Sequence, residues 1–75
     1  MKIKVFGVLS EVVQNTEIET KPVFNTDSLI NDLMHNYPLL KNYRFQVVVN
    51  QEKIEGNTLL MDGDDIALLP PYAGG

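Results

Sequence analysis

Alternating polar and apolar residues predict β-strands near both ends of the chain, each with one buried face. Within residues 2–5 the apolar positions are Ile3 and Val5, and residues 16–20 alternate in the same way. Residues 45–49 are rich in β-branched and aromatic side chains, which favours a central strand. Because the first two strands are close in sequence, we expect them to be antiparallel neighbours.

The last third of the chain predicts two further strands. After an Asn-Gln turn at residues 50–51, a short strand is expected at residues 53–54. Residues 65–69 form a final apolar strand, which follows an Asp-Gly turn at residues 62–63 and ends at the prolines of residues 70–71.

One long helix is predicted over residues 26–37. Thr26 is expected to cap its free N–H groups, and Asp27 suits the positive end of the helix dipole. Pro38 ends the helix. Residues 9–13 can form one shorter helical turn. The apolar residues of the long helix recur at helical spacing and form one stripe: Leu29, Ile30, Leu33, Met34 and Tyr37.

Strand, strand, helix, strand, short strand and strand together predict an α+β fold. We expect a single domain over residues 1–75, with a mixed sheet and one main helix packed on one face. Leu29, Leu33 and Met34 are expected in the core, and the strand from Asp65 beside the first strand. A domain this small buries only about 60% of the surface that its unfolded chain exposes. This favours a binding or carrier module over an enzyme.

Charge and composition narrow the classes of partner. The formal net charge of −4 argues against a nucleic-acid partner and against an anionic membrane surface. The chain has no cysteine, which excludes disulfides, thiolate metal sites and cysteine nucleophiles. Residues 1–7 do not resemble a signal peptide, and no apolar run approaches the roughly 20 residues that span a bilayer. We expect a cytoplasmic protein.

Few side chains suggest metal or acid–base chemistry. Asp62, Asp64 and Asp65 do not match the spacing of a calcium loop, and a turn with a solvated acidic rim is the favoured interpretation. His35 lies near the end of the predicted helix, where it complements the dipole. We therefore expect no metal and no cofactor bound by this chain.

The strongest functional candidate is the C-terminal segment, residues 70–75. Gly74 and Gly75 lack a Cβ atom, so the walls of a narrow channel can approach their backbone closely. Pro70 and Pro71 hold an extended backbone and stop strand pairing, which projects the tail away from the domain. Six extended residues reach roughly 20 Å, enough to enter a buried site of a partner. From Tyr72 onward, this tail is expected to be mobile in the free protein and ordered only in a partner.

A docking surface beside the tail is the second candidate. If Ile3 and Val5 face the helix, Phe6 faces the other side of the sheet. Of Leu68 and Leu69, one must face outward if the other faces inward. An exposed apolar group beside the tail would form a docking patch. The alternative is ordinary scattered exposure, or a bulge that turns Phe6 inward.

Several segments resemble the MoaD/ThiS family of ubiquitin-like sulfur carriers, whose fold is the β-grasp. Residues 48–51 (Val-Val-Asn-Gln) resemble its strand-turn, and residues 62–67 its Asp-Gly-Asp turn and strand. Residues 69–75 (Leu-Pro-Pro-Tyr-Ala-Gly-Gly) resemble its tail. Residues 6–11 resemble its Phe-x-x-Leu-Arg-Glu segment near the start of the chain, with Ser10 in place of the usual arginine. Within the family, the closest resemblance is to the small subunits of molybdopterin synthase.

This resemblance implies a sulfur carrier without catalytic activity of its own. An adenylating, MoeB-like enzyme would use ATP to activate the Gly75 carboxylate, and a sulfur donor would convert it to a thiocarboxylate. The tail would enter a MoaE-like large subunit, in a heterotetramer of two small and two large subunits, and donate sulfur to cyclic pyranopterin monophosphate. The reacting terminus would be Gly74 and Gly75. The partner-binding residues would be Phe6, Leu68, Leu69, Pro70, Pro71, Tyr72 and Ala73.

Three other functions remain open at this point. A carrier for the thiazole of thiamine is the nearest, although the prolines at residues 70–71 and the chain length favour molybdopterin. A protein modifier would join Gly75 to lysines of target proteins. A plain β-grasp interaction module would not need the tail.

Overall fold

The computed structural model describes residues 1–71, which form a mixed sheet of five strands in the order β2-β1-β5-β3-β4. The predicted site residues Tyr72, Ala73, Gly74 and Gly75, and the expectation that the tail is ordered only in a partner, lie outside the described residues. The elements are β1 (Lys2–Val5), α1 (Val8–Val13), β2 (Glu17–Glu19), α2 (Thr26–Asn36), the 3-10 helix η1 (Pro38–Asn42), β3 (Gln46–Val49), β4 (Glu52–Lys53) and β5 (Ile66–Leu69).

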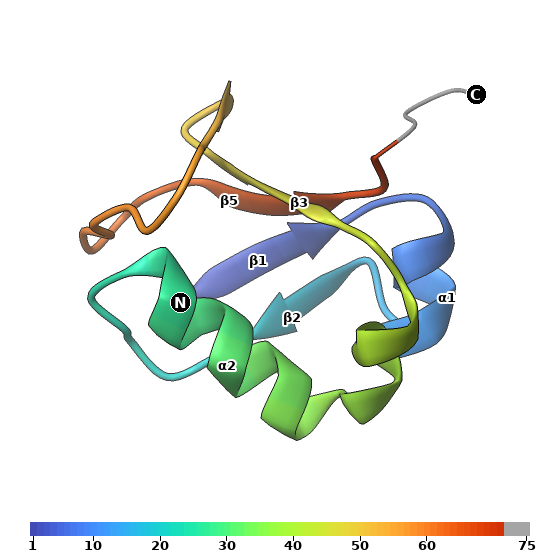
Figure 1. The fold of residues 1–75 in the computed structure, drawn as a ribbon. Helices are drawn as coiled ribbons and strands as arrows, with labels where there is room; N and C mark the ends of the chain where they lie inside the picture. Colours follow the sequence, from blue (N-terminus) through green and yellow to red (C-terminus); the bar gives the residue numbers. More distant parts are fainter. Residues whose placement is uncertain (72–75) are drawn as a thin grey trace.

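The sheet and α2 form two layers, with α2 across one face of the sheet (Figure 1). The first strand has two neighbours: β1 is antiparallel to β2 and parallel to β5. On its other side, β5 is antiparallel to β3. The predicted α+β arrangement, the antiparallel pairing of the first two strands and the place of the last strand beside the first are confirmed.

The central strand of the sheet is β5, so the prediction of a central strand at residues 45–49 is wrong. β3 has β5 on one side and only the two-residue β4 on the other. A β-branched composition reports how strongly the faces of a strand are buried. It does not determine how many strands lie on either side.

α2 begins at Thr26 as predicted and ends at Asn36, one residue before the predicted end, but its capping residue is not the predicted one. Asn25, not Thr26, is the cap: its side-chain oxygen accepts a hydrogen bond from the Ser28 N–H at 2.9 Å. Thr26 is the first helical residue and is buried, and its hydroxyl accepts a hydrogen bond from the Thr58 N–H at 2.9 Å. Tyr37 ends the helix with φ −130° and ψ 75°, because the following Pro38 disfavours helical backbone at this position.

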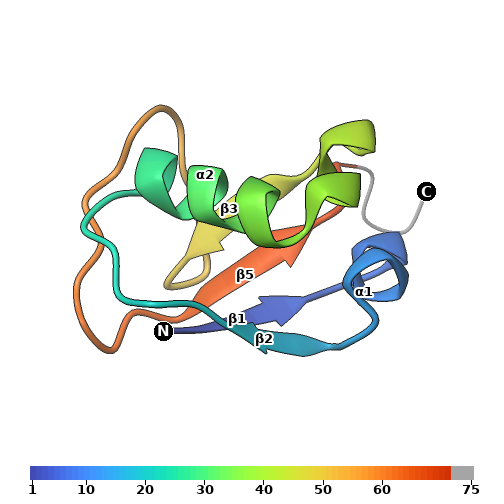
Figure 2. The same ribbon diagram turned by 90° about the horizontal axis from the view of Figure 1, so that it is seen from below.

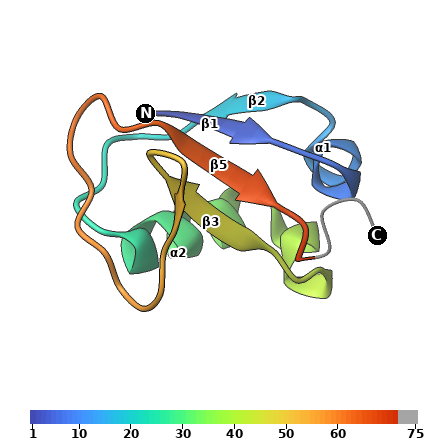
Figure 3. The ribbon, with the colours of Figure 1, turned by 90° about the horizontal axis from the view of Figure 1, so that it is seen from above.

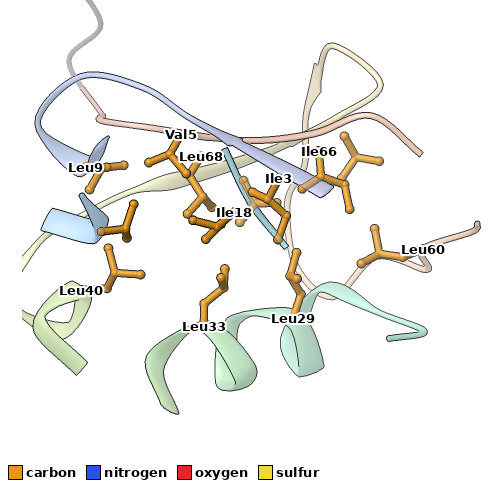
Figure 4. Packing of buried hydrophobic residues seen from close by; sticks show 13 residues of the cluster. Ile3, Val5, Leu9, Ile18, Leu29, Leu33, Leu40, Leu60, Ile66 and Leu68 are labelled. Carbon is orange, nitrogen blue, oxygen red and sulfur yellow. The ribbon is translucent and has the colours of Figure 1, made fainter. Parts of the chain in front are cut away.

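The core lies between α2 and the inner face of the sheet (Figure 4). Leu29 and Leu33 point from α2 toward Ile3 and Leu68, and all four side chains are fully buried. Met34 is only partly buried at the margin of this cluster, so its predicted place in the core is wrong. The remaining core residues are Val5, Leu9, Val13, Ile18, Leu40, Val47, Val49, Leu60 and Ile66.

Two short helices close the end of the molecule where β1 and β5 finish (Figure 2). The predicted turn at residues 9–13 is α1, and Leu9 is its fully buried residue. The 3-10 helix η1 was not predicted from the sequence; it begins at Pro38 and buries Leu40. In the described part of the chain, no helix is long and apolar enough to cross a membrane.

Leu33 gives a direct test of this core. Replacing it by alanine removes a fully buried side chain facing the sheet, so we expect the free energy of unfolding to fall by about 2–5 kcal/mol. Urea denaturation measures this loss. Leu39→Ala is the matched control, because Leu39 is 62% exposed and its loss should change stability by no more than about 0.5 kcal/mol. Equal losses in both variants would contradict the placement of α2.

Candidate functional site

The root of the C-terminal tail is fixed at the end of the central strand. Phe6 directly follows β1, and its N–H donates to the carbonyl oxygen of Leu68 in β5 at 3.1 Å. Pro70 and Pro71 follow, and since neither has an N–H group, both are unable to donate to the ladder. Both prolines are half-buried, so the domain fixes the start of the tail.

Leu68 and Leu69 face opposite sides of the sheet. Leu68 is fully buried beneath the sheet, whereas Leu69 is half-buried on the outer face. The predicted partner contact of Leu68 is therefore corrected: its side chain belongs to the core and is unavailable for docking. Leu69 keeps its predicted position beside the tail.

The outer face of the sheet forms an apolar surface around Phe6. The Phe6 side chain is 46% exposed, as predicted from the inward direction of Ile3 and Val5. Figure 3 shows this face, with β1, β5 and β3 side by side and α2 on the far side. A shallow hollow of about 250 Å³ lies on it. We define the docking face by its apolar lining residues Phe6, Val48, Ala67 and Leu69.

Charged groups line the edge of the docking face. Lys4 Nζ lies 3.8 Å from an Asp65 carboxylate oxygen, and both side chains are at least half exposed. An ion pair this exposed contributes little to stability. An apolar centre with a charged rim is the usual composition of a protein interface. The surface therefore has the chemistry of a docking site, and it adjoins the root of the tail.

Val48 and Ala67 were not identified from the sequence as parts of this face. The signal was available, because Val47 and Val49 are buried and their strand alternates, which turns Val48 outward. The same reasoning applies to Ala67 between Ile66 and Leu68. The contact of Gln46 with Pro71 had no such signal: its Nε2 donates to the Pro71 carbonyl oxygen at 3.2 Å across 25 positions of sequence.

Among the acidic residues of segment 62–65, Asp64 organises the turn. The two carboxylate oxygens of Asp64 accept hydrogen bonds from the Met61 N–H at 2.7 Å and from Asn50 Nδ2 at 3.1 Å. These two bonds, the backbone one first, lower the pKa of Asp64 below its usual value of 3.8. The carboxylate of Asp65 forms an ion pair with Lys4. His35 lies exposed in the last turn of α2, where its dipole interaction was expected.

Comparison with known proteins agrees with this geometry. Residues 3–75 match the model of the ThiS family. The chain belongs to the ThiS family. It is 35% identical over 75 residues to the molybdopterin synthase sulfur carrier subunit of Mycobacterium tuberculosis, covering 93% of this chain and 90% of that protein. The predicted membership of the MoaD/ThiS family is confirmed.

Solved structures show the β-grasp fold predicted for a ThiS-family protein. The small archaeal modifier protein 1 of Methanosarcina acetivorans superposes with a TM-score of 0.78 at 26% identity, covering 99% of this chain and 94% of that one. A chain of the Amycolatopsis orientalis BexX/CysO complex gives 0.77 at 24% identity, covering 99% and 98%. At 24% identity, the similarity to the Amycolatopsis orientalis chain shows only a shared fold.

The turn at Asp64 predicts how stability depends on pH. The pKa of Asp64 is lowered in the folded state, so its stabilising contribution is present above the pKa of the unfolded chain, about 3.9. This contribution is lost as the pH falls below about 4 and through the folded pKa. Asp64→Asn should therefore show a smaller loss of stability than the wild type between neutral pH and about pH 3. Urea denaturation across this range measures the difference, and parallel curves would contradict it.

Proposed function

We propose that this ThiS-family chain is the sulfur-carrier subunit of a molybdopterin synthase and works through Gly74 and Gly75. The observation that carries the proposal is its 35% identity, over nearly the whole of both chains, to a protein of that name. The geometry supports it, because the central strand β5 leads directly into the Pro-Pro-Tyr-Ala-Gly-Gly segment and an apolar docking face lies beside that exit.

The proposed chemistry takes place on the terminal carboxylate. A carboxylate oxygen of Gly75 attacks the α-phosphate of ATP on an activating enzyme, which releases pyrophosphate and leaves an acyl adenylate. The terminal sulfur of a persulfide then attacks the acyl carbon and displaces AMP. A thiol reduces the resulting acyl disulfide and leaves a thiocarboxylate on Gly75. This chain supplies the acyl group and its presentation, and its partners supply the catalytic groups.

The thiocarboxylate then delivers its sulfur in the large subunit of the synthase. There the substrate would be cyclic pyranopterin monophosphate, and the proposed assembly holds two small and two large subunits. The docking face defined by Phe6, Val48, Ala67 and Leu69 would contact the large subunit, and the net charge of −4 favours a basic partner surface. A cytoplasmic location is part of this proposal.

A second candidate function is protein modification. It is favoured by the 26% identity to the small archaeal modifier protein 1 of Methanosarcina acetivorans across almost the whole chain. In this function the activated Gly75 would form an isopeptide bond with a lysine of a target protein. Immunoblots for the chain separate the two functions, because a modifier gives a ladder of heavier conjugates whereas a sulfur carrier gives only the free protein.

Deletion of Gly75 tests the proposed carrier function. The reacting carbonyl would retreat by one residue, roughly 3.3 Å, and misplacement by about 1 Å can already cost on the order of 100-fold in rate. We expect the shortened chain to form no thiocarboxylate with the activating enzyme, ATP and a persulfide donor, as followed by intact-protein mass spectrometry.

The control for this deletion is stability. The free energy of unfolding should change by no more than about 0.5 kcal/mol, because the deletion removes no core residue. A shortened chain that still supported pterin sulfuration at the normal rate would exclude a carrier function of the terminus and favour a plain interaction module.

The docking face is tested with Phe6→Ala. Phe6 combines a large aromatic ring with 46% exposure on this face, so we expect the Kd for the large subunit to rise by at least about fivefold. Isothermal titration calorimetry with the purified large subunit measures it. Leu59→Ala is the matched control: Leu59 is also apolar and 80% exposed, but it lies in the loop before the Asp62-Gly63 turn, away from the root of the tail. Similar losses for the two variants would contradict this docking face.

A further inference from the structure

Two contacts outside the sheet ladder hold the root of the tail. The central strand β5 lies between β1 and β3, and its pairing ends at Leu69. Pro70 and Pro71 have no N–H to continue it. Instead, Gly7 contacts Pro70 on the side of β1, and Gln46 contacts Pro71 on the side of β3. The two prolines are thus held from both neighbours at the positions where the next ladder bonds would form.

On the first side, the backbone of Gly7 makes room for the ring of Pro70. An ideal Cβ atom placed on Gly7 would lie only 2.7 Å from Pro70 Cγ, closer than two carbon atoms can pack. Gly7 also has φ 60° and ψ −145°, a region of backbone conformation that is essentially restricted to glycine. Ser10 fixes this turn, since its hydroxyl and its N–H donate to the Gly7 carbonyl oxygen at 2.7 and 3.1 Å.

On the other side, a side chain bonds to the backbone just beyond the end of the ladder. Gln46 pairs with Leu69 in the register of β3 and β5, and its side chain points to the outer face of the sheet. From there its Nε2 reaches along the strand and donates to the Pro71 carbonyl oxygen at 3.2 Å. The bond is partly buried, so water competes with it less than at an open surface.

We propose that Gly7 and Gln46 are positioning residues, which set the direction in which the domain presents Gly75 to an enzyme that acts on it. This inference rests on the proposed carrier function. Four residues follow Pro71, and fully extended they would span about 13 Å, so a change of direction of about 10° at the root moves the end by roughly 2 Å. A displacement of this size is enough to lower the rate of a positioned reaction.

Gln46→Met tests the contact with Pro71. Methionine keeps the length of the side chain but cannot donate a hydrogen bond. Steady-state kinetics with the activating enzyme, with the carrier as the varied substrate, should show kcat for thiocarboxylate formation about 2- to 10-fold lower, the factor expected for one net hydrogen bond. KM should change little, because the docking face is otherwise intact. Gln46→Lys should retain most of kcat, because an ammonium group can donate to the same oxygen.

Val48→Thr is the control for docking. Val48 lies two residues along the same strand on the same outer face, and threonine has nearly the same shape. With an activating enzyme that contacts the same face, this variant should raise KM without the fall in kcat that marks a loss of positioning. A Gln46→Met variant with the kcat of the wild type, or with a change in KM alone, would overturn the positioning role of Gln46.

The contact of Gly7 is tested by a double-mutant cycle with Pro70. Gly7→Ala should lower kcat, and the loss should be smaller in a Pro70→Ala background, where the Cγ atom that the new methyl group meets is absent. Gly56→Ala controls for the addition of a methyl group at a positive φ, because Gly56 has φ 71° but an added Cβ there meets no atom within 4 Å. Equal losses of kcat in the two backgrounds would overturn the positioning role of Gly7.

The wild-type protein separates failure of this inference from failure of the proposed function. If the wild type acquires no sulfur with the activating enzyme, ATP and a persulfide donor, the carrier function is wrong and the positioning role falls with it. If the wild type is converted and the Gln46 and Gly7 variants are converted equally well, only the positioning role is wrong.

Discussion

The parallel pairing of β1 with β5 is the contact on which the rest of the molecule depends. It joins the first and last strands of the chain in the middle of the sheet, and the inner side chains of these strands, Ile3, Val5, Ile66 and Leu68, are all buried against the helical layer. Parallel neighbours must be connected by a crossover, and here the whole intervening chain, including α2 and β3, forms that connection. The core is therefore complete only when the last strand is in place. The residue at which β5 ends, and hence the root of the tail, is fixed by the same contacts that close the core.

Because successive side chains of a strand face opposite sides of the sheet, β5 contributes to both the core and the docking face. Ile66 and Leu68 fill the core, while Ala67 and Leu69 face outward beside Phe6. A shift of register by one residue would exchange these sets and place both the core leucine and the docking leucine on the wrong face. The burial of Leu68 thus specifies the exposure of Leu69, although neither residue was assigned to one face from the sequence. A domain this small needs no separate scaffold for its docking surface, because the outer face of its most strongly held strand provides one.

Local periodicity predicted the strands and the main helix. The features that it did not predict depend on contacts between segments far apart in the sequence. The alternation in residues 2–5 gave the inward direction of Ile3 and Val5, and the apolar stripe gave α2 to within one residue. Asn25 and Thr26 are both of residue types that commonly cap helices. Asn25 is the cap because the hydroxyl of Thr26 instead accepts a bond from Thr58, 32 positions away. The place of β5 at the centre of the sheet and the contact of Gln46 with Pro71 likewise join distant segments. No local pattern records such pairs. The resemblance of the tail to known carriers suggested the proposed function, which periodicity alone could not.

The prolines convert the end of a central strand into an exit from the sheet. A central strand has a neighbour on each side, and without prolines its backbone could continue to pair with the segments after β1 and before β3. Pro70 and Pro71 remove both N–H donors, so the ladder stops at a defined residue. The neighbouring segments then meet the chain through other contacts, the open backbone of Gly7 and the carboxamide of Gln46. An edge strand would offer only one such neighbour, and its tail could swing away on the open side. Starting the tail from the centre of the sheet gives it two lateral supports, which suits a protein whose proposed chemistry occurs on its terminus and inside other proteins.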